Sequence, residues 1–349
     1  MLTPPTPSWL AHEIASQPTL IEELLAREIP HVTEIVARLP PFSYIVIAAR
    51  GSSDHAATYA VYCWAALAGW PVALAAPSLY TLYETPPRLE GALVVGISQS
   101  GQSPDIVAVL TEARRQGRPT LAITNDHNSP LGNIADEVVE LGVGIEQSVA
   151  ATKTYVAQLA VVATFAASWS GNPERLAELR AMPAALDATL QRTSDIAARI
   201  QRYRDAEGFT VIGRGFNYAT AFELALKLKE LTYAQAIAYS SADFRHGPVA
   251  TISKGSPVIL MMPRGAVYAD MYELALELRQ READLLVISD APEGLAFATT
   301  PLPLAVTVPE WLSPLTTILP GQIFALHLTL ARGLNPDAPR GLHKVTQTF

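Results

Sequence analysis

Apolar residues gather in short runs along this chain, and stretches with helical spacing separate them. Four runs rich in Val, Ile, Leu and Ala are predicted strands: 44–49, 71–76, 93–97 and 120–124. Between them, residues 55–69 and the segment after Pro104 repeat apolar positions with the helical period. Short apolar strands that alternate with helices predict βαβ units and a parallel sheet.

The same alternation returns in the second half, with predicted strands at 209–213, 258–262 and 285–289. Helices are predicted after Asn217 and over most of residues 312–334. At the N-terminus, Ser8 is a predicted N-cap for a helix from Trp9 to about Arg27, with Pro18 as a place where it can kink. Residues 152–170 form a nearly all-apolar helix, which must be buried against the sheet or a partner subunit.

The two halves align with each other. AARG at 48–51 resembles IGRG at 212–215, and the same offset places LVVGISQSG (93–101) on PVILMMPRG (257–265). This favours duplication of one α/β domain, although any two parallel-sheet segments share some likeness at this level. The predicted fold is α/β with two tandem doubly wound, flavodoxin-like domains. Its predicted parts are an arm and helix (1–30), a first domain (31–171), a helical connector (172–206), a second domain (207–335) and a tail closing the active site (336–349).

Composition narrows the class of protein. Of the 349 residues, 49% are apolar and 17% are charged, which is typical of a compact protein with much buried surface. A net charge of −8 argues against a nucleic-acid or membrane surface. The single cysteine, Cys63, lies in an apolar helical stretch, so a reducing, cytoplasmic setting is expected. The N-terminus lacks a signal-peptide pattern, and the most apolar run is too short to cross a bilayer.

A polar turn between a predicted strand and a predicted helix points to chemistry. In SQSGQS, residues 98–103, three hydroxyls, two amides and a glycine precede Pro104 and Asp105. Ser103 as N-cap with Pro at N1 marks a helix start, whose free N–H groups favour an anion. Ser-rich turns also cap helices without binding anything. The number of donors exceeds what capping needs, so we predict a phosphate site.

The first strand ends in a similar turn, ARGSSDHA at 49–56, which offers Ser52 and Ser53. Two hydroxyl-rich turns in one domain indicate a phosphorylated ligand held between them. The sequence has no GxxxxGK[ST] loop and neither turn reads GxGxxG, so a nucleotide is not expected. No metal-ligand spacing is present, and no cofactor is expected.

The second half contains three candidate catalytic residues. Lys227, Glu230 and Ala234 are predicted to share one helical face, where Glu230 would be at least half buried and suited to general-base duty. A solvated ion pair with a neighbouring lysine is the alternative for Glu230. His246 lies in a predicted turn, where histidines are more often exposed than catalytic, and Lys344 in the tail has the pattern of a surface lysine.

Four segments together give a family resemblance: ISQSGQSPD, ATKTY at 151–155, ALKLKELTYAQA followed by FRHGP, and the tail APRGLHKVT. In this order they resemble the sugar-isomerase (SIS) proteins, specifically the isomerase half of glucosamine-6-phosphate synthase. The resemblance runs from about Trp9 to the C-terminus.

The resemblance implies a role for each matching residue. The phosphate contacts implied are Ser53, Ser98, Gln99, Ser100 and Ser103. Glu230 is implied as the base that moves a proton between C1 and C2, His246 of the neighbouring subunit as the group assisting ring opening, and Lys344 as the amine at the open-chain carbonyl carbon. The sugar contacts implied are Arg50, Ser52, Val149, Ala151 and His343. A homodimer is therefore expected, with the apolar helix at 152–170 and the C-terminal helix as surface to bury.

Three departures from the family pattern leave the sugar open. Arg50 stands where the synthase has a small residue, Ala151 where it has serine, and Ile237 where it has glutamate. Arg50 could reach the ligand phosphate or hydroxyls, or pair with a carboxylate. The sequence begins at the isomerase half and lacks an N-terminal cysteine, so glutamine-dependent synthesis is not expected.

Three functions are compatible with the sequence. The first is conversion of glucosamine 6-phosphate to fructose 6-phosphate and ammonia. The second is the same chemistry on another substrate, as in a galactosamine-6-phosphate deaminase or a fructosamine-6-phosphate deglycase. The third is a non-catalytic sugar-phosphate-binding protein, which the presence of all three catalytic-type residues disfavours.

Overall fold

The computed structural model describes residues 8–193 and 196–344, and its contacts divide the chain into two compact units. The N-terminal unit comprises Thr19–Glu146 and Lys153–Ala181, together with His343 and Lys344 of the tail. The C-terminal unit comprises the chain up to Pro18, Gln147–Thr152 and Met182–Leu342. The division between Ala181 and Met182 falls inside the predicted helical connector. The predicted arm (1–7) and the last five residues lie outside the described part of the chain.

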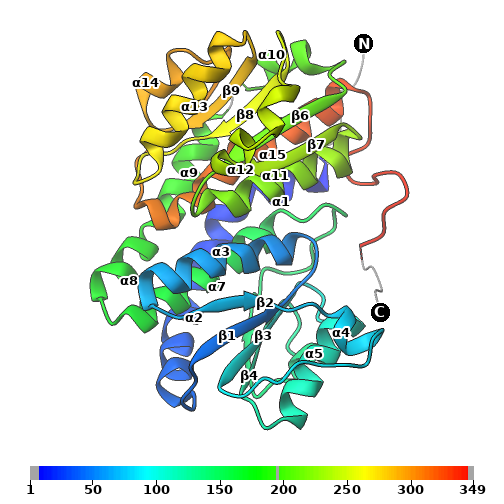
Figure 1. The fold of residues 1–349 in the computed structure, drawn as a ribbon, viewed down its shortest axis with the longest axis vertical. Helices are drawn as coiled ribbons and strands as arrows, with labels where there is room; N and C mark the ends of the chain where they lie inside the picture. The colour runs from blue at the N-terminus through cyan, green and yellow to red at the C-terminus, as the bar shows by residue number, and fades with distance from the viewer. Residues whose placement is uncertain (1–7, 194–195, 345–349) are drawn as a thin grey trace. The chain divides into compact units, whose positions relative to one another are not determined.

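The N-terminal unit is built on a five-stranded parallel sheet with the strand order β2-β1-β3-β4-β5 (Figure 1). Its strands are β1 (Tyr44–Ala48), β2 (Val72–Leu74), β3 (Ala92–Ser98), β4 (Thr120–Thr124) and β5 (Glu137–Glu140). Its helices are most of α2 (Gln17–Arg38), then α3 (Ser52–Ala68), α4 (Ser78–Thr81), α5 (Pro104–Arg115), α6 (Pro130–Ile134), α7 (Lys153–Ser170) and α8 (Pro173–Arg180).

Two helix layers bury this sheet. Apolar residues of α5, among them Ile106 and Leu110, pack in one cluster with Val46 and Val94 of β1 and β3. Helices α3 and α7 lie side by side (Figure 1), and the Trp64 indole N–H donates to the Val162 carbonyl at 2.9 Å. With both faces covered, the strands are nearly continuous apolar runs, which is why the sequence pattern identified them.

The C-terminal unit has a second five-stranded parallel sheet, with the order β10-β9-β8-β6-β7. Its strands are β6 (Gly208–Gly213), β7 (Gln235–Ser240), β8 (Pro257–Met261), β9 (Asp284–Ser289) and β10 (Thr300–Pro303). Its helices are α1 (Trp9–Ala15), α9 (Met182–Arg192), α10 (Ile196–Arg199), α11 (Asn217–Thr232), α12 (Ser241–Arg245), α13 (Tyr268–Gln280), α14 (Pro292–Leu295) and α15 (Ser313–Ala331), with short 3₁₀ turns η1 (Ile200–Tyr203), η2 (Pro248–Thr251) and η3 (Glu310–Leu312).

The predicted internal repeat is confirmed by the strand orders. In each sheet the first strand, β1 or β6, lies next to one edge, with the second strand at that edge and the remaining three, in chain order, on the other side. The number of residues between Tyr44, at the start of β1, and Gly208, at the start of β6, equals the number that separates the aligned segments 48–51 and 212–215. The α/β fold with two tandem doubly wound domains is therefore as predicted.

The predicted C-terminal end of the first helix, at about Arg27, is wrong. The helical conformation is interrupted at Ser16, between α1 and α2. Helix α2 then continues to Arg38, beyond the predicted end at Arg27. Pro18 lies in the first turn of α2, where its missing N–H costs no helical hydrogen bond. Apolar residues with helical spacing, Ile21, Leu24, Leu25, Ile29, Val32 and Ile35, are buried along α2 and explain its length.

The two apolar helices, expected to offer surface to a second subunit, are largely buried. Helix α7 is buried from Lys153 to Ala167, and α15 is buried from Ser313 through Gln322 and at most positions beyond. The surface that they were expected to offer a second subunit is already covered. Among the described residues, only Glu310–Ala331 has the length and hydropathy of a membrane-spanning helix, and 78% of its most apolar stretch is buried inside the protein, as in a core helix.

Candidate functional site

The polar turn between β3 and α5 forms the predicted loop at the carboxyl end of the first sheet. Ser98 Oγ accepts from the Gly101 N–H at 3.2 Å, and Ser100 Oγ accepts from the Gln102 N–H at 3.3 Å. Ser103 occupies the N-cap position of α5, yet its side chain makes no capping hydrogen bond. Its hydroxyl is thus not used for the structural role that was the alternative to ligand binding. Because a phosphate site is predicted there, residues 98–103 are called the phosphate loop from here on.

Gly101 is required by the geometry of this loop. Its φ is +62°, in the left-handed region, and a Cβ there would lie 2.0 Å from Ser129 Oγ. A larger residue would displace both the turn and the neighbouring Ser129.

Ser53 lies in the first turn of α3, after the neighbouring strand β1, so the turn that carries it meets the phosphate loop at the same sheet edge. Ser53 is buried, and its Oγ accepts from Gln158 Nε2 of α7 at 2.9 Å. Because Gln158 supplies a donor, the hydroxyl proton of Ser53 can point to a ligand. Ser52, one residue earlier, is half-buried.

Arg50, after β1, forms an ion pair with the acid that begins α5. Its Nε lies 2.8 Å from Asp105 Oδ2; the Arg50 side chain is 48% exposed and that of Asp105 is fully buried. Of the three possibilities for Arg50, pairing with a carboxylate is therefore the one that the structure contains. Burial raises the pKa of Asp54 at the start of α3, while the charges of His55 and Arg50 oppose that rise.

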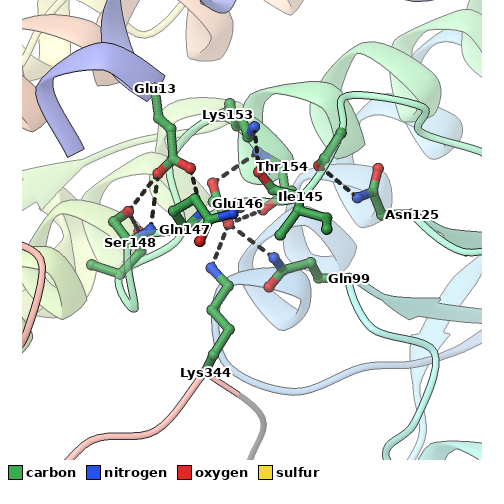
Figure 2. Close-up of polar contacts among 12 residues, drawn as sticks. Glu13, Gln99, Asn125, Ile145, Glu146, Gln147, Ser148, Lys153, Thr154 and Lys344 are labelled. Carbon is green, nitrogen blue, oxygen red and sulfur yellow. Dashed lines mark hydrogen bonds and ion pairs between the residues drawn. The ribbon is translucent and has the colours of Figure 1, made fainter. Parts of the chain in front are cut away.

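The tail lysine belongs to the N-terminal unit. Its side chain points to Glu146 (Figure 2). Lys344 Nζ lies 2.8 Å from Glu146 Oε2, and Gln99 Nε2 of the phosphate loop donates to the same oxygen at 3.0 Å. The structure thus brings together Gln99 and Lys344, two residues that the sequence singled out separately. His343 is exposed beside Lys344.

The segment that carries Val149 and Ala151 belongs to the C-terminal unit and is fixed by Glu13 of α1. Glu13 is buried, and its carboxylate accepts from the backbone N–H of Gln147 and from both the N–H and the hydroxyl of Ser148 (Figure 2). Val149 and Ala151 are half-buried.

Glu230 lies on α11 in a buried charged cluster. Lys227 Nζ is 2.6 Å from Glu230 Oε2 and 3.4 Å from Glu223 Oε1. The side chains of Lys227 and Glu223 are 1% and 0% exposed, and that of Glu230 is 22% exposed. Glu230 is more than half buried, as predicted, and its lysine partner is buried rather than solvated.

One element of that prediction is wrong. Ala234 is not on the face of α11, because the helix ends at Thr232 and Tyr233 adopts a left-handed φ of +58°. Ala234 instead precedes strand β7, which the sequence pattern did not reveal. His246 follows α12 in a turn and is exposed, as its sequence context predicted.

Four side chains, two in each unit, were not identified from the sequence: Glu13 and Glu223 in the C-terminal unit, and Glu146 and Gln158 in the N-terminal unit. Each is buried and polar. An isolated acid or amide in an apolar segment, such as Gln158 in residues 156–169 or Glu146 in GVGIEQ, is the available signal. Among the described residues, no group of three or more His, Cys, Asp or Glu side chains is placed to hold a metal ion.

The SIS domain model matches residues 43–168 and 203–332, one match in each sheet domain. The chain belongs to the SIS family. Curated relatives include the isomerizing glutamine–fructose-6-phosphate aminotransferases of Gloeobacter violaceus (35% identical over 354 residues) and Pyrococcus horikoshii (32% over 348 residues). Each alignment covers 96% of this chain but only 58% and 57% of the relative, so the chain spans little more than half their length.

Solved structures share this fold. The C-terminal domain of the Francisella tularensis glucosamine-fructose-6-phosphate aminotransferase matches with a TM-score of 0.87 and 25% identity, over 97% of this chain and all of that one. A Silicibacter pomeroyi protein, classed only provisionally as a phosphosugar isomerase, matches with a TM-score of 0.84 and 32% identity, over 95% of this chain and all of that one. A glucosamine-6-phosphate deaminase from Thermotoga maritima shares the fold at 20% identity, with a TM-score of 0.79 over 98% of this chain and all of that one.

Proposed function

We propose that this SIS protein is an amino-sugar-phosphate deaminase/isomerase that converts glucosamine 6-phosphate and water to fructose 6-phosphate and ammonia. The observation that carries the proposal is the placement of the Lys344 amine beside the phosphate loop, through an oxygen that it shares with Gln99. A primary amine next to a phosphate site is suited to the carbonyl carbon of an open-chain sugar phosphate.

In this mechanism the phosphate loop and Ser53 hold the ligand phosphate, and that binding orients the reacting carbons. Glu230 removes the proton from C2 of the open-chain aldose, which gives an enolamine. Return of the proton to C1 converts the enolamine to the C2 imine of the ketose, and water hydrolyses that imine to the C2 ketone with release of ammonia. The buried Lys227 amine lies 2.6 Å from Glu230 Oε2 and holds the side chain of the proposed base in place.

The one cysteine of this sequence takes no part in the proposed reaction. Cys63 is fully buried on α3. Burial raises the pKa of its thiol to about 12, so it is not a reactive thiolate. The steps above use side-chain acid–base and amine chemistry and call for no cofactor.

The proposal includes a homodimer with His246 acting in the partner's site, in a cytoplasmic setting. The exposed turn that carries His246 is available to a second subunit. The proposal involves no nucleic acid and no membrane, in keeping with a net charge of −8.

An ammonia-release assay with a panel of substrates tests the proposal: glucosamine 6-phosphate, galactosamine 6-phosphate, fructosamine 6-phosphate and unphosphorylated glucosamine. We expect turnover of glucosamine 6-phosphate that Lys344→Ala abolishes and Lys254→Ala leaves unchanged, because Lys254 is an exposed lysine paired with Glu282. Ammonia release from another compound of the panel, and not from glucosamine 6-phosphate, would identify that compound as the substrate. If the protein binds sugar phosphates tightly but turns over none of them, it is a non-catalytic sugar-phosphate-binding protein.

A further inference from the structure

One carboxylate joins the phosphate loop, the tail and helix α7. Glu146 is 2% exposed, and its Oε2 accepts from Gln99 Nε2 at 3.0 Å, from Lys344 Nζ at 2.8 Å and from Thr154 Oγ1 at 2.7 Å (Figure 2). Its Oε1 accepts from the Thr154 N–H at 3.2 Å. All four groups belong to the N-terminal unit.

A purely structural role accounts for only part of this arrangement. The contacts with Thr154 cap the first turn of α7, since a carboxylate there satisfies an N–H group that the helix leaves unpaired. Capping does not require that a loop amide 47 residues away and a tail lysine 198 residues away end on the same carboxylate oxygen. A buried carboxylate that collects a cation and a loop donor fixes both of them in place.

The tail needs such an anchor. After α15 and the turn at 332–333, the described tail contains no helix or strand, so no regular structure aims the side chain of Lys344. A lysine amine on a four-carbon stem has many rotamers, and a reactive amine gains its rate from being held where the carbonyl arrives.

We propose that Glu146 is the positioning residue for Lys344: it holds the amine at a set place beside the phosphate loop, through the oxygen shared with Gln99. The inference rests on the proposed function, in which that amine meets the sugar carbonyl. A ligand whose phosphate occupies the loop then presents its carbonyl to an amine already in position. Removing the carboxylate slows the reaction of Lys344 while leaving the phosphate loop able to bind.

The test measures amine reactivity and phosphate binding separately. The protein is incubated with glyceraldehyde and cyanoborohydride; the amine condenses with the aldehyde, water leaves, and hydride from the cyanoborohydride reduces the imine to a secondary amine. Peptide mass spectrometry then follows labelling of Lys344, with the exposed Lys254 as internal reference. Phosphate binding is followed by calorimetry with inorganic phosphate.

For Glu146→Gln we expect labelling of Lys344 to slow by about tenfold or more, the scale of a misplaced reacting group. Its phosphate affinity should remain within about threefold of wild type, because the loop donors are retained. The matched control is Glu140→Gln, which removes the same charge from an exposed position on β5 and should change neither quantity. Glu146→Asp, which keeps the charge but is one methylene shorter, should give an intermediate rate.

Thr154→Val separates positioning from capping, because it removes one helix-start contact and leaves the ion pair of Glu146 with Lys344. Equal labelling of Lys344 in wild type and Glu146→Gln would overturn the inference, as would an equal loss in Thr154→Val and Glu146→Gln. A parallel loss of labelling, phosphate affinity and thermal stability in Glu146→Asp would also overturn it, in favour of a folding role. A wild-type protein that turns over no substrate and gives no Lys344 adduct would overturn the proposed function as well.

Discussion

Arg50 and Asp105 form an ion pair between two turns at the same edge of the first sheet, with Arg50 Nε 2.8 Å from Asp105 Oδ2. Asp105 is fully buried in the first turn of α5, and its other oxygen accepts from the Ile106 N–H. An acid at this helix start opposes the binding of an anion to the loop before it, and the guanidinium offsets that charge. We therefore expect Arg50 to favour the binding of an anion at the phosphate loop.

Replacing Arg50 with alanine should therefore affect stability and ligand binding together. It leaves a buried carboxylate without its cation, and a charged hydrogen bond of this kind is worth about 1.5–3 kcal/mol. We expect a fall of that size in the free energy of unfolding, measured by urea denaturation, and a raised KM for the sugar phosphate. Arg115→Ala, which breaks an exposed pair with Glu112 on the same helix, is the control and should cost less than about 1 kcal/mol. Equal effects of the two substitutions would contradict this role of Arg50.

Local patterns explain why most of the fold was predictable. Strands β1, β3, β4, β6, β8 and β9 are apolar runs covered on both faces, and their patterns survive in the sequence. The edge strands β5 (EVVE) and β10 (TPLP) are short and half polar, and β7 follows α11 after two residues. Nothing in the pattern separates β7 from the helix, because the break depends on the left-handed conformation of Tyr233.

Part of the candidate site was likewise predictable from the sequence, and part was not. The phosphate loop was recognisable because its donors are adjacent in sequence and precede a helix start. Glu146 was not, because its significance comes from Gln99 and Lys344, which are distant in sequence. Glu223 lies four residues before Lys227, yet its burial, and hence its role in the charged cluster, follows from packing that the sequence does not display.

Glu230→Gln tests the proposed base. The amide keeps the shape of the side chain but accepts no proton, so kcat should fall by roughly 10² to 10⁴-fold with little change in KM. The fold should survive, because Lys227 keeps its contact with Glu223. Steady-state kinetics with glucosamine 6-phosphate measure the effect, and Lys229→Gln, at the exposed neighbouring position, is the control. Unchanged turnover in Glu230→Gln would exclude it as the base.

Ser100→Ala tests the phosphate loop. Removing one hydroxyl donor to a charged phosphate costs about 1.5–3 kcal/mol, so KM should rise on the order of tenfold to a hundredfold. The fall in kcat should be smaller, because the reacting carbons are untouched. The control in the same loop is Gln102→Ala, since Gln102 is exposed. A variant that binds inorganic phosphate as wild type does, but turns over nothing at saturation, would place Ser100 at the reacting carbons instead.

Cys63 should be unreactive in the folded protein. Burial raises the pKa of its thiol to about 12, so the thiolate is scarce at pH 8, and the side chain is also inaccessible. The unfolded chain has a thiol pKa of about 8.5, so this burial stabilises the fold below that pH and loses its effect as pH rises toward 12. A chromogenic disulfide reagent at pH 8 should label the native protein slowly and the guanidinium-unfolded protein rapidly. Fast native labelling would place Cys63 at an accessible site.

In the proposed homodimer, each active site combines residues of two subunits. If Glu230 of one subunit works with His246 of its partner, Glu230→Gln and His246→Ala should each be nearly inactive alone. Mixing the two variants under conditions that exchange subunits creates heterodimers in which one site combines both intact residues and the other site combines both substitutions.

With random exchange, half of the dimers are mixed and one of their two sites is intact, so activity should recover to about one quarter of wild type. Mixing Glu230→Gln with Ser100→Ala shows whether the phosphate loop and Glu230 of one chain belong to the same site. If they do, no mixed site is intact and activity does not recover; if the loop works with Glu230 of the partner, it recovers. Light scattering establishes that a dimer is present before and after mixing. An active monomer, or mixtures of Glu230→Gln and His246→Ala that stay inactive although subunits exchange, would show that His246 acts within its own chain or not at all.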